Sequence, residues 1–278
     1  MKYPEFSVLI SVYCKENPIW LKDAFDSIFM QTIPPSEIVL VKDGQLTREL
    51  DEVIEEYSKR YALFKIISNE ENLGLGLALQ KGVLACSNEI IARMDTDDTM
   101  PKDRFEKQLK VINEGYDVVS CWSQIFTEDM QNTVAIKKRP EFHEDIVKLA
   151  KRRSPVCHAA CFFRKSAVIK AGNYQHCHFY EDYHLWVRMI ISGAKFYNVQ
   201  EVLYNVRTTT EQLKRRGGYQ YFKNEIKTFK SFQKMGFYSV KDVVINSVIR
   251  IIVRLSPHQL REWLIVKIWN TNKVSNGK

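Results

Sequence analysis

The sequence predicts an α/β fold whose sheet is mainly parallel, because short apolar runs alternate with segments of helical spacing over the first 113 residues. The apolar runs lie at 6–13, 37–41, 63–67 and 90–94, and the helical segments lie at 18–31, 47–61, 73–85 and 101–113. Parallel neighbours need a long return connection, which a helix supplies as a right-handed crossover. Ligands of such sheets bind beyond the carboxyl ends of the strands. The residues that follow each run are therefore the first candidates for a functional site.

After residue 113 the regular alternation stops. We expect a strand at 117–122, an antiparallel excursion at 124–138, a helix at 143–151, a strand at 159–163, a helix at 180–192 and a bent strand or strand pair at 195–206. Helical periodicity then continues to the end. Because the composition changes near residue 205 without a linker, the sequence predicts two parts, a sheet domain over 1–205 and a basic amphipathic helical segment over 206–278.

The composition is that of a folded protein with a sizeable core. The chain has 278 residues, of which 45% are hydrophobic and 27% charged. Its six cysteines include no CxxC pair and lie partly in apolar runs, so we expect reduced thiols in a cytosolic protein. The first apolar run is too short for a signal peptide or a membrane span, so the sequence does not indicate export.

Positive charge is concentrated in the last quarter of the chain. Residues 205–278 contain 15 Lys and Arg against 4 Asp and Glu, whereas the whole chain carries +8. Such a segment is expected to face a polyanion: membrane headgroups, a phosphorylated substrate or nucleic acid. Apolar residues recur at helical spacing over 243–255 and 260–269, with Trp beside Arg and Lys, which favours an anionic membrane surface over nucleic acid. A helical pair that closes the core is the alternative.

Three carboxylates in four positions, Asp95, Asp97 and Asp98, follow the apolar run that ends at Arg93 and Met94. Ionised carboxylates cannot be buried together without a cation, because each would lose its hydration and repel the others. Hard oxygen ligands of this kind suit Mg²⁺ or Mn²⁺. The alternative interpretation is a solvated acidic turn that caps the next helix.

Other polar residues lie at the expected strand ends. Asp43, followed by Gly44, could accept hydrogen bonds from a heterocycle, although an Asp-Gly pair is more often simply a turn. Tyr13 could stack on a base or pack in the core. Glu16 could contact a ribose or cap the first helix.

Two further motifs stand before predicted helices. The segment 72–78 carries Gly74 and Gly76 and suits close packing of a helix on the sheet, but it is neither a P-loop nor a GxGxxG fingerprint. Glu181 and Asp182 open a helix, where a carboxylate is either a structural cap or a general base. The pair His176 and His178 is interpreted as incidental, because no further soft-metal ligands accompany it.

Taken in order, Val41-Lys42-Asp43-Gly44, Asn72-Leu73-Gly74, Met94 to Asp98 and Tyr180 to Trp186 resemble the inverting family-2 glycosyltransferases of the GT-A fold. The resemblance covers roughly residues 5–210 and points to the bacterial branch that builds O-antigen, capsule and exopolysaccharide. It implies a Rossmann-like, mainly parallel mixed sheet with helices on both faces. The chain departs from the common pattern at Ser11-Val12-Tyr13-Cys14 and at Lys42, which bears on the base and the donor more than on the reaction class.

The resemblance also implies a role for each matching residue. Asp43, Tyr13, Glu16, Arg93 and Asp95 would bind the nucleotide, with Asp97 and Asp98 as metal ligands and Asp182 as the catalytic base. We expect the acceptor or its diphosphate to be bound by Glu181, Trp186, Arg207, Arg215 and Arg216, the last two because of the positive charge of the C-terminal segment.

The implied activity is metal-dependent inverting transfer of a hexosyl or N-acetylhexosaminyl unit from a UDP-sugar to a lipid-diphosphate-linked saccharide. Mn²⁺ or Mg²⁺ is the expected cofactor. The expected location is peripheral, on the inner face of the bacterial inner membrane, with no nucleic-acid partner and no indicated oligomeric state. The alternatives are a non-enzymatic nucleic-acid-binding module and a sugar nucleotidyltransferase. The latter would need a Gly-rich, basic first loop, which residues 11–17 do not supply.

Overall fold

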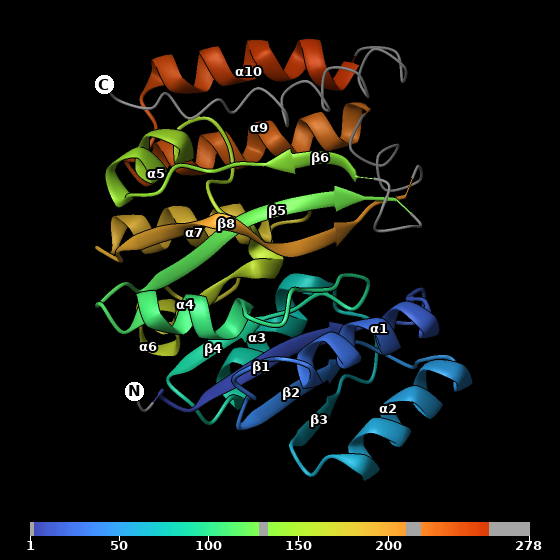
Figure 1. The fold of residues 1–278 in the computed structure, drawn as a ribbon. Helices are drawn as coiled ribbons and strands as arrows, with labels where there is room; N and C mark the ends of the chain where they lie inside the picture. Colours follow the sequence, from blue (N-terminus) through green and yellow to red (C-terminus); the bar gives the residue numbers. More distant parts are fainter. Residues whose placement is uncertain (1–2, 128–132, 210–217, 256–278) are drawn as a thin grey trace.

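Eight strands form one mixed sheet in the computed structural model, which describes residues 3–127, 133–209 and 218–255 (Figure 1). The strand order is β3-β2-β1-β4-β7-β5-β6, with β8 paired to β5. The pairs among β1 to β4 and the β5–β8 pair are parallel, whereas β7 and β6 run antiparallel to their neighbours. The predicted α/β fold with a mainly parallel sheet is confirmed.

The first half of the chain alternates strands and helices as predicted. Its elements are β1 (Phe6–Val12), α1 (Pro18–Phe29), β2 (Glu37–Lys42), α2 (Arg48–Arg60), β3 (Phe64–Ser68), α3 (Leu75–Ala85), β4 (Ile90–Arg93) and α4 (Arg104–Ile112). Helix α1 begins with Pro18 in its first turn, and the Asn17 side chain accepts hydrogen bonds from the amides of Ile19 and Trp20. Strands β1, β2 and β4 are buried along most of their length, which explains their continuous apolar sequences.

The second half holds shorter elements. They are β5 (Val118–Phe126), β6 (Thr133–Lys137), α5 (His143–Ala150), the 3₁₀ turn η1 (His158–Ala160), β7 (Phe162–Arg164), α6 (Lys165–Lys170), α7 (Glu181–Ile191), β8 (Phe196–Arg207), α9 (Tyr219–Lys234) and α10 (Val240–Leu255). The strand predicted at 159–163 was placed too early, because its first residues form η1. Helix α6 was not predicted. Strand β8 ends at Arg207, two residues beyond the expected boundary at 205.

Helices cover both faces of the sheet. One core cluster joins α1, α2 and α4 to the sheet, and a second joins α3, α6 and α7 to its other face. Trp186 of α7 lies in the second cluster with 0% exposure, against Phe163 and Phe196. Its predicted contact with an acceptor is therefore wrong: Trp186 is a core residue.

The C-terminal helices pack at one end of the molecule, beyond α5 and α7 (Figure 1). Phe229 and Phe232 of α9 and Phe237 and Tyr238 in the following turn form a third cluster with Tyr183 of α7. In the described ranges no helix combines the length and apolarity that a membrane crossing requires. The helix expected at 260–269 and the residues Arg215 and Arg216 lie outside the described residues.

Candidate functional site

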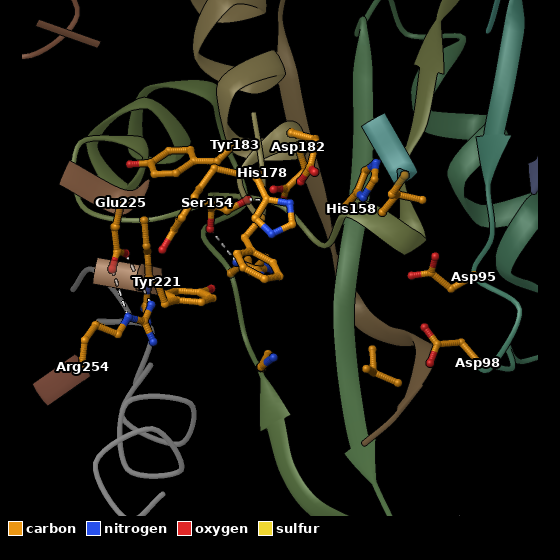
Figure 2. A pocket seen from close by; sticks show the side chains of 18 of the residues that line it. Asp95, Asp98, Ser154, His158, His178, Asp182, Tyr183, Tyr221, Glu225 and Arg254 are labelled. Carbon is orange, nitrogen blue, oxygen red and sulfur yellow. Dashed lines mark hydrogen bonds and ion pairs between the residues drawn. The ribbon is translucent and has the colours of Figure 1, made fainter. Parts of the chain in front are cut away.

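A cleft of about 730 Å³ opens where the carboxyl ends of the central strands meet the later helices (Figure 2). Asp95 and Asp98 lie on one side, Glu225 and Arg254 of the C-terminal helices lie on the other, and Ser154 and Asp182 lie between them. The cleft is lined by segments that are far apart in sequence. Predicted site residues from the aspartate loop and from α7 thus share one cavity.

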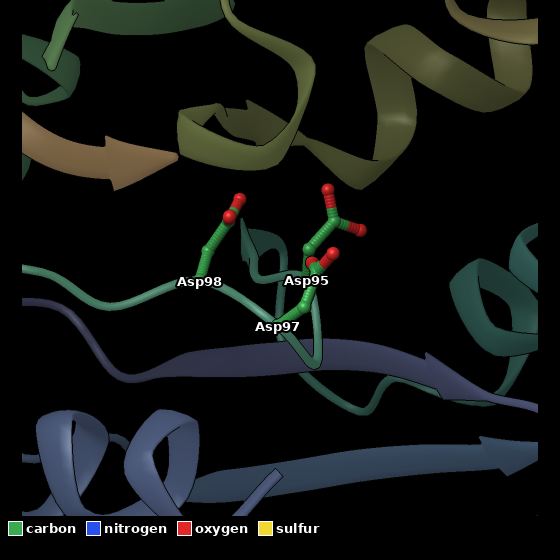
Figure 3. Close-up of side chains that lie close together, drawn as sticks. All are labelled: Asp95, Asp97 and Asp98. Atoms are coloured by element: carbon green, nitrogen blue, oxygen red, sulfur yellow. The ribbon is translucent and has the colours of Figure 1, made fainter. Parts of the chain in front are cut away.

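The three aspartates after β4 converge as the sequence predicts. One oxygen from each of Asp95, Asp97 and Asp98 lies within 4.8 Å of the other two (Figure 3). The set consists only of hard oxygen donors, which suits a hard divalent cation. Asp95 therefore belongs to the group that could hold a metal ion, as well as to the predicted nucleotide site.

Residues of β8 hold this loop in place. The backbone amide of Arg207 donates to Asp98 Oδ1 at 2.8 Å, and its Nε donates to the carbonyl of Asp97 at 2.9 Å. The amide of Asp95 donates to the Tyr204 hydroxyl at 3.1 Å. The guanidinium of Arg207 also pairs with Asp23 of α1 at 3.1 Å, so Arg207 connects the loop to both β8 and α1. Its predicted contact with the acceptor stays a prediction.

Arg93 has a different role from the one predicted. Its side chain is 0% exposed, and its guanidinium donates to the Asp95 carboxylate and to the carbonyl of Met94. A buried guanidinium cannot touch a nucleotide in the cleft. Arg93 is therefore a positioning residue that orients Asp95 from below.

Crowding and burial shape the electrostatics of the loop. Asp98 is only 2% exposed, and burial together with the charges of Asp97 and Asp95 raises its pKa well above its usual range. Burial and the neighbouring Asp97 also raise the pKa of Glu16 to about 7. A bound cation would remove this repulsion, so the residues fit a divalent metal.

Asp43 anchors the loop that leads into α3. Its carboxylate is 3% exposed and accepts hydrogen bonds from the Asn69 side chain at 2.8 Å and from the amides of Leu73 and Gly74 at 3.0 and 2.9 Å. These bonds explain why Asp43 and the 72–74 motif occur in the same sequence: the carboxylate of the first binds the backbone of the second. The predicted contacts of Asp43, Tyr13 and Glu16 with a nucleoside stay predictions, and none of the three lines the cleft described above.

Asp182 stands in the first turn of α7 and faces the cleft. The hydroxyl of Ser154 donates to Asp182 Oδ2 at 3.1 Å. Burial raises the pKa of Asp182, while hydrogen bonds from the Tyr183 amide and Ser154 oppose that rise. Burial also raises the pKa of the adjacent Glu181 to about 7. Both carboxyl groups can therefore take up a proton more readily than exposed ones.

Gly76 leaves room for Glu181. A Cβ at Gly76 would lie 2.7 Å from the Glu181 Cγ and 3.2 Å from the carbonyl of Gln175. The start of α3 can approach the start of α7 only because this side chain is absent.

Several cleft residues were not predicted from the sequence. His158 lies near Asp182, and its Nε2 is 2.8 Å from the Tyr174 hydroxyl (Figure 2). Burial lowers the pKa of His158 well below its usual range, so the ring is neutral. Further cleft residues that were not predicted include Arg139, Arg153, Ser154, Tyr221, Glu225, Arg250 and Arg254. No local motif marks any of them as part of a site; for the last four the sequence indicated only a basic helical segment.

Comparisons with known proteins agree with this geometry. Residues 7–172 match the family model described as Glycosyl transferase family 2. The UDP-Gal:alpha-D-GlcNAc-diphosphoundecaprenol beta-1,3-galactosyltransferase of Escherichia coli is 37% identical over 95% of this chain and 96% of its own length. The amylovoran biosynthesis glycosyltransferase AmsE of Erwinia amylovora is 35% identical over 94% of this chain and 98% of its own.

Solved structures are similar in fold. TarS 1–349 of S. aureus, in complex with UDP-GlcNAc, has a TM-score of 0.69 and 14% identity, over 94% of this chain and 79% of that one. In another TarS structure the matched region spans 48% of that protein's chain, with a TM-score of 0.60. At this identity the likeness concerns the fold alone.

Proposed function

Because the chain belongs to glycosyl transferase family 2, we propose that it moves a hexosyl or N-acetylhexosaminyl unit from a UDP-sugar to a saccharide linked through diphosphate to a lipid. The name of the E. coli relative supports this acceptor, and the name of the Erwinia relative, an amylovoran biosynthesis glycosyltransferase, supports a place in bacterial surface polysaccharide synthesis. The observation that carries the proposal is that Asp182 and the three converged aspartates face one cleft.

The donor diphosphate would lie beside Asp95, Asp97 and Asp98, with Mn²⁺ or Mg²⁺ as the cation. When bound, such a cation neutralises the diphosphate and stabilises it as a leaving group. Arg93, Tyr204 and Arg207 would keep the carboxylates in place for it, because each is hydrogen-bonded to the loop.

Asp182 would act as the general base. Its carboxylate takes the proton of the acceptor hydroxyl, the acceptor oxygen bonds to the anomeric carbon, and the bond from that carbon to the UDP oxygen breaks. Attack from the side opposite UDP inverts an α-linked donor to a β-linked product. Ser154 supports the role of Asp182, because its hydroxyl holds one carboxylate oxygen and leaves the group oriented toward the cleft.

A donor screen tests this function. Purified protein would receive UDP-Gal, UDP-Glc or UDP-GlcNAc with Mn²⁺ or Mg²⁺, and a short alkyl diphosphate carrying α-linked GlcNAc as acceptor. We expect UDP release with one donor, product formation that stops with EDTA, and a β linkage by NMR. An α-linked product would refute inversion, unchanged turnover in EDTA would refute metal dependence, and no product with any donor would refute the proposed transfer.

We also propose that the protein acts peripherally, on the inner face of the bacterial inner membrane. Helix α10 exposes a row of apolar side chains although its other face packs on the molecule: Val240, Val244, Val248, Ile249, Ile251 and Ile252. Val244 and Ile252 are 55% and 61% exposed. An apolar stripe beside basic residues suits the boundary of an anionic bilayer.

Vesicle co-sedimentation tests the membrane contact. Val244→Glu and Val248→Glu place charge on the exposed face and should reduce binding to anionic vesicles, while UDP binding persists. Leu84→Glu is the matched control, because Leu84 is 61% exposed on α3. If the full chain remains in the supernatant at low salt, or if only the Leu84 variant loses binding, the membrane proposal is wrong.

A further inference from the structure

Arginine side chains gather on the part of the cleft that faces α9 and α10. Arg139, Arg153, Arg250 and Arg254 all line the cavity. Glu225, which is buried, pairs with Arg250 at 2.9 Å and with Arg254 at 3.0 Å. This wall thus carries four guanidinium groups, two of which pair with Glu225, so its net charge is positive.

The arginines of this group differ in their surroundings. Burial disfavours the charged form of an arginine and so lowers its pKa. Burial and the charges of Arg139 and Arg250 together lower the pKa of Arg153 to about 10. Arg254, by contrast, has a raised pKa because it pairs with Glu225, which outweighs its burial. The Nε of Arg139 is buried and has no hydrogen-bond partner among the described residues. Like charges held together in a cavity favour binding of an anion.

Hydrogen bonds connect this cluster to the proposed base. Arg139 Nη1 donates to the carbonyl of Ser154 at 3.0 Å, and the Ser154 hydroxyl donates to Asp182. Arg250 Nη2 donates to the carbonyl of Arg152 at 3.0 Å, and so fixes the segment that carries Arg153. An anion bound by the cluster would therefore lie at a defined position relative to Asp182.

We propose that Arg139, Arg153 and Arg250 bind the diphosphate group of the acceptor, while the acceptor sugar reaches Asp182. The proposal rests on the function proposed above for the choice of acceptor. Guanidinium groups bind phosphate oxygens through two parallel hydrogen bonds, so three of them match the oxygens of a diphosphate. The aspartate loop lies beyond Asp182 and would hold the donor diphosphate instead, together with a divalent cation (Figure 2).

The position of α10 adds an independent reason. Arg250 of this helix lines the cleft, whereas Val248, Ile249 and Ile251 of the same helix are exposed. One helix thus places a phosphate-binding group inside the cavity and an apolar stripe outside it. A lipid diphosphate needs both features: the cationic wall for its diphosphate, and an apolar surface next to it for its lipid chain or for the membrane that holds the chain.

Binding measurements test the site without requiring turnover. Farnesyl diphosphate would be titrated into protein saturated with UDP and Mn²⁺. We expect Arg153→Gln and Arg139→Gln each to weaken its binding about tenfold or more, since hydrogen bonds to charged groups are the strong ones. Arg152→Gln is the matched control: Arg152 is adjacent in sequence but exposed, and it pairs with Asp242 at 2.9 Å. Farnesyl monophosphate should bind the wild type more weakly than farnesyl diphosphate does. Its affinity should also fall less than that of the diphosphate in the Arg153 and Arg139 variants.

Kinetics with the GlcNAc-diphosphate acceptor separate the possible outcomes. The same variants should raise the acceptor KM about tenfold or more, with the KM for the UDP-sugar unchanged and unfolding temperatures like that of the wild type. If the wild type binds farnesyl diphosphate but transfers no sugar, the proposed function fails and the diphosphate site stands. If the wild type does not bind the diphosphate, or the Arg152 variant loses as much affinity as the Arg153 variant, the proposed site is wrong.

Discussion

The cleft contains two acidic sites that differ in what surrounds their carboxylates. Burial is the main cause of the raised pKa at both sites, but at the loop 95–98 three carboxylates lie within 4.8 Å of one another, and the charges of Asp97 and Asp95 raise the Asp98 pKa further. At Asp182, hydrogen bonds from the Tyr183 amide and Ser154 oppose the effect of burial. Crowded carboxylates are relieved by a cation, whereas a buried carboxylate without such crowding is relieved by a proton. The comparison thus supports the metal binding proposed for one site and the proton transfer proposed for the other.

The supports of the two sites also differ. The aspartate loop is bonded to β8, through Tyr204 and Arg207, and to Arg93 in the buried end of β4. Asp182 is held by Ser154, in a segment that α10 contacts through Arg250. The proposed metal site is therefore supported by the central sheet, while the position of the proposed base depends on the C-terminal helices.

The largest expected effect separates the two sites directly. Asp182→Asn removes basicity without changing shape, so we expect turnover to fall about 10²- to 10⁴-fold, the usual contribution of a general base. Binding of UDP with Mn²⁺, measured by calorimetry, should stay at the wild-type value. Asp145→Asn is a suitable control, because Asp145 also lies in the first turn of a helix but is exposed. A variant that kept more than about a tenth of the wild-type rate would make Asp182 a helix cap.

The converse substitutions should affect binding first. We expect Asp97→Ala and Asp98→Ala to weaken Mn²⁺-dependent UDP binding about 100-fold, or roughly 2.7 kcal/mol, because each removes an oxygen from the converged set. Calorimetry with UDP, in Mn²⁺ and again in EDTA, provides the measurement. Asp103→Ala serves as control, since Asp103 follows the loop but pairs with Lys107. Unchanged affinity in both loop variants would contradict the metal assignment.

The parts of this site that could be predicted from the sequence are those marked by residues close together in the chain. The strands and the acidic loop were predicted because apolar periodicity and clustered carboxylates are local patterns. Glu181 and Asp182 were recognised as the start of a predicted helix, and the family resemblance then gave Asp182 the role of base. In each case neighbouring residues carry the information, and the sheet topology brings the strand ends together.

The errors and omissions have long-range causes. Trp186 was assigned to the acceptor through the motif Tyr180 to Trp186, but it lies one turn further along α7 than Asp182, where its side chain packs in the core against Phe163 and Phe196. The cluster of Arg139, Arg153 and Arg250 could not be predicted, because it forms only when α10 packs beside the segment after α5. The basic charge of the C-terminal segment was recognised, but its contribution to the cleft was not.

A moderate effect should follow from closing the space between α3 and α7. Gly76→Ala places a methyl group against the Glu181 side chain, whose Cγ would be 2.7 Å away. We expect turnover to fall about three- to tenfold, because the methyl group would displace the start of α7, which carries Asp182. A small displacement of a catalytic group slows the reaction considerably. Glu181→Ala removes that Cγ, so the glycine substitution should cost less in this background. Equal losses in both backgrounds would show that the methyl group acts elsewhere.

The smallest expected effect tests how Ser154 adjusts the base. Its hydroxyl donates to Asp182 and lowers the pKa that burial raises, so Ser154→Ala should raise that pKa further. Only the ionised carboxylate accepts a proton, so activity rises with pH through the pKa of Asp182, and the variant should need a higher pH for the same rate. On the acidic limb we expect a loss of about fivefold, since a hydrogen bond contributes about 1 kcal/mol; at high pH the two rates should converge. Ser192→Ala, at the far end of α7, is the control, because its hydroxyl donates to the Met189 carbonyl at the same helix end, away from Asp182. A pH–rate profile of kcat/KM decides the matter: an equal loss at every pH would mean that Ser154 places Asp182 without affecting its proton affinity.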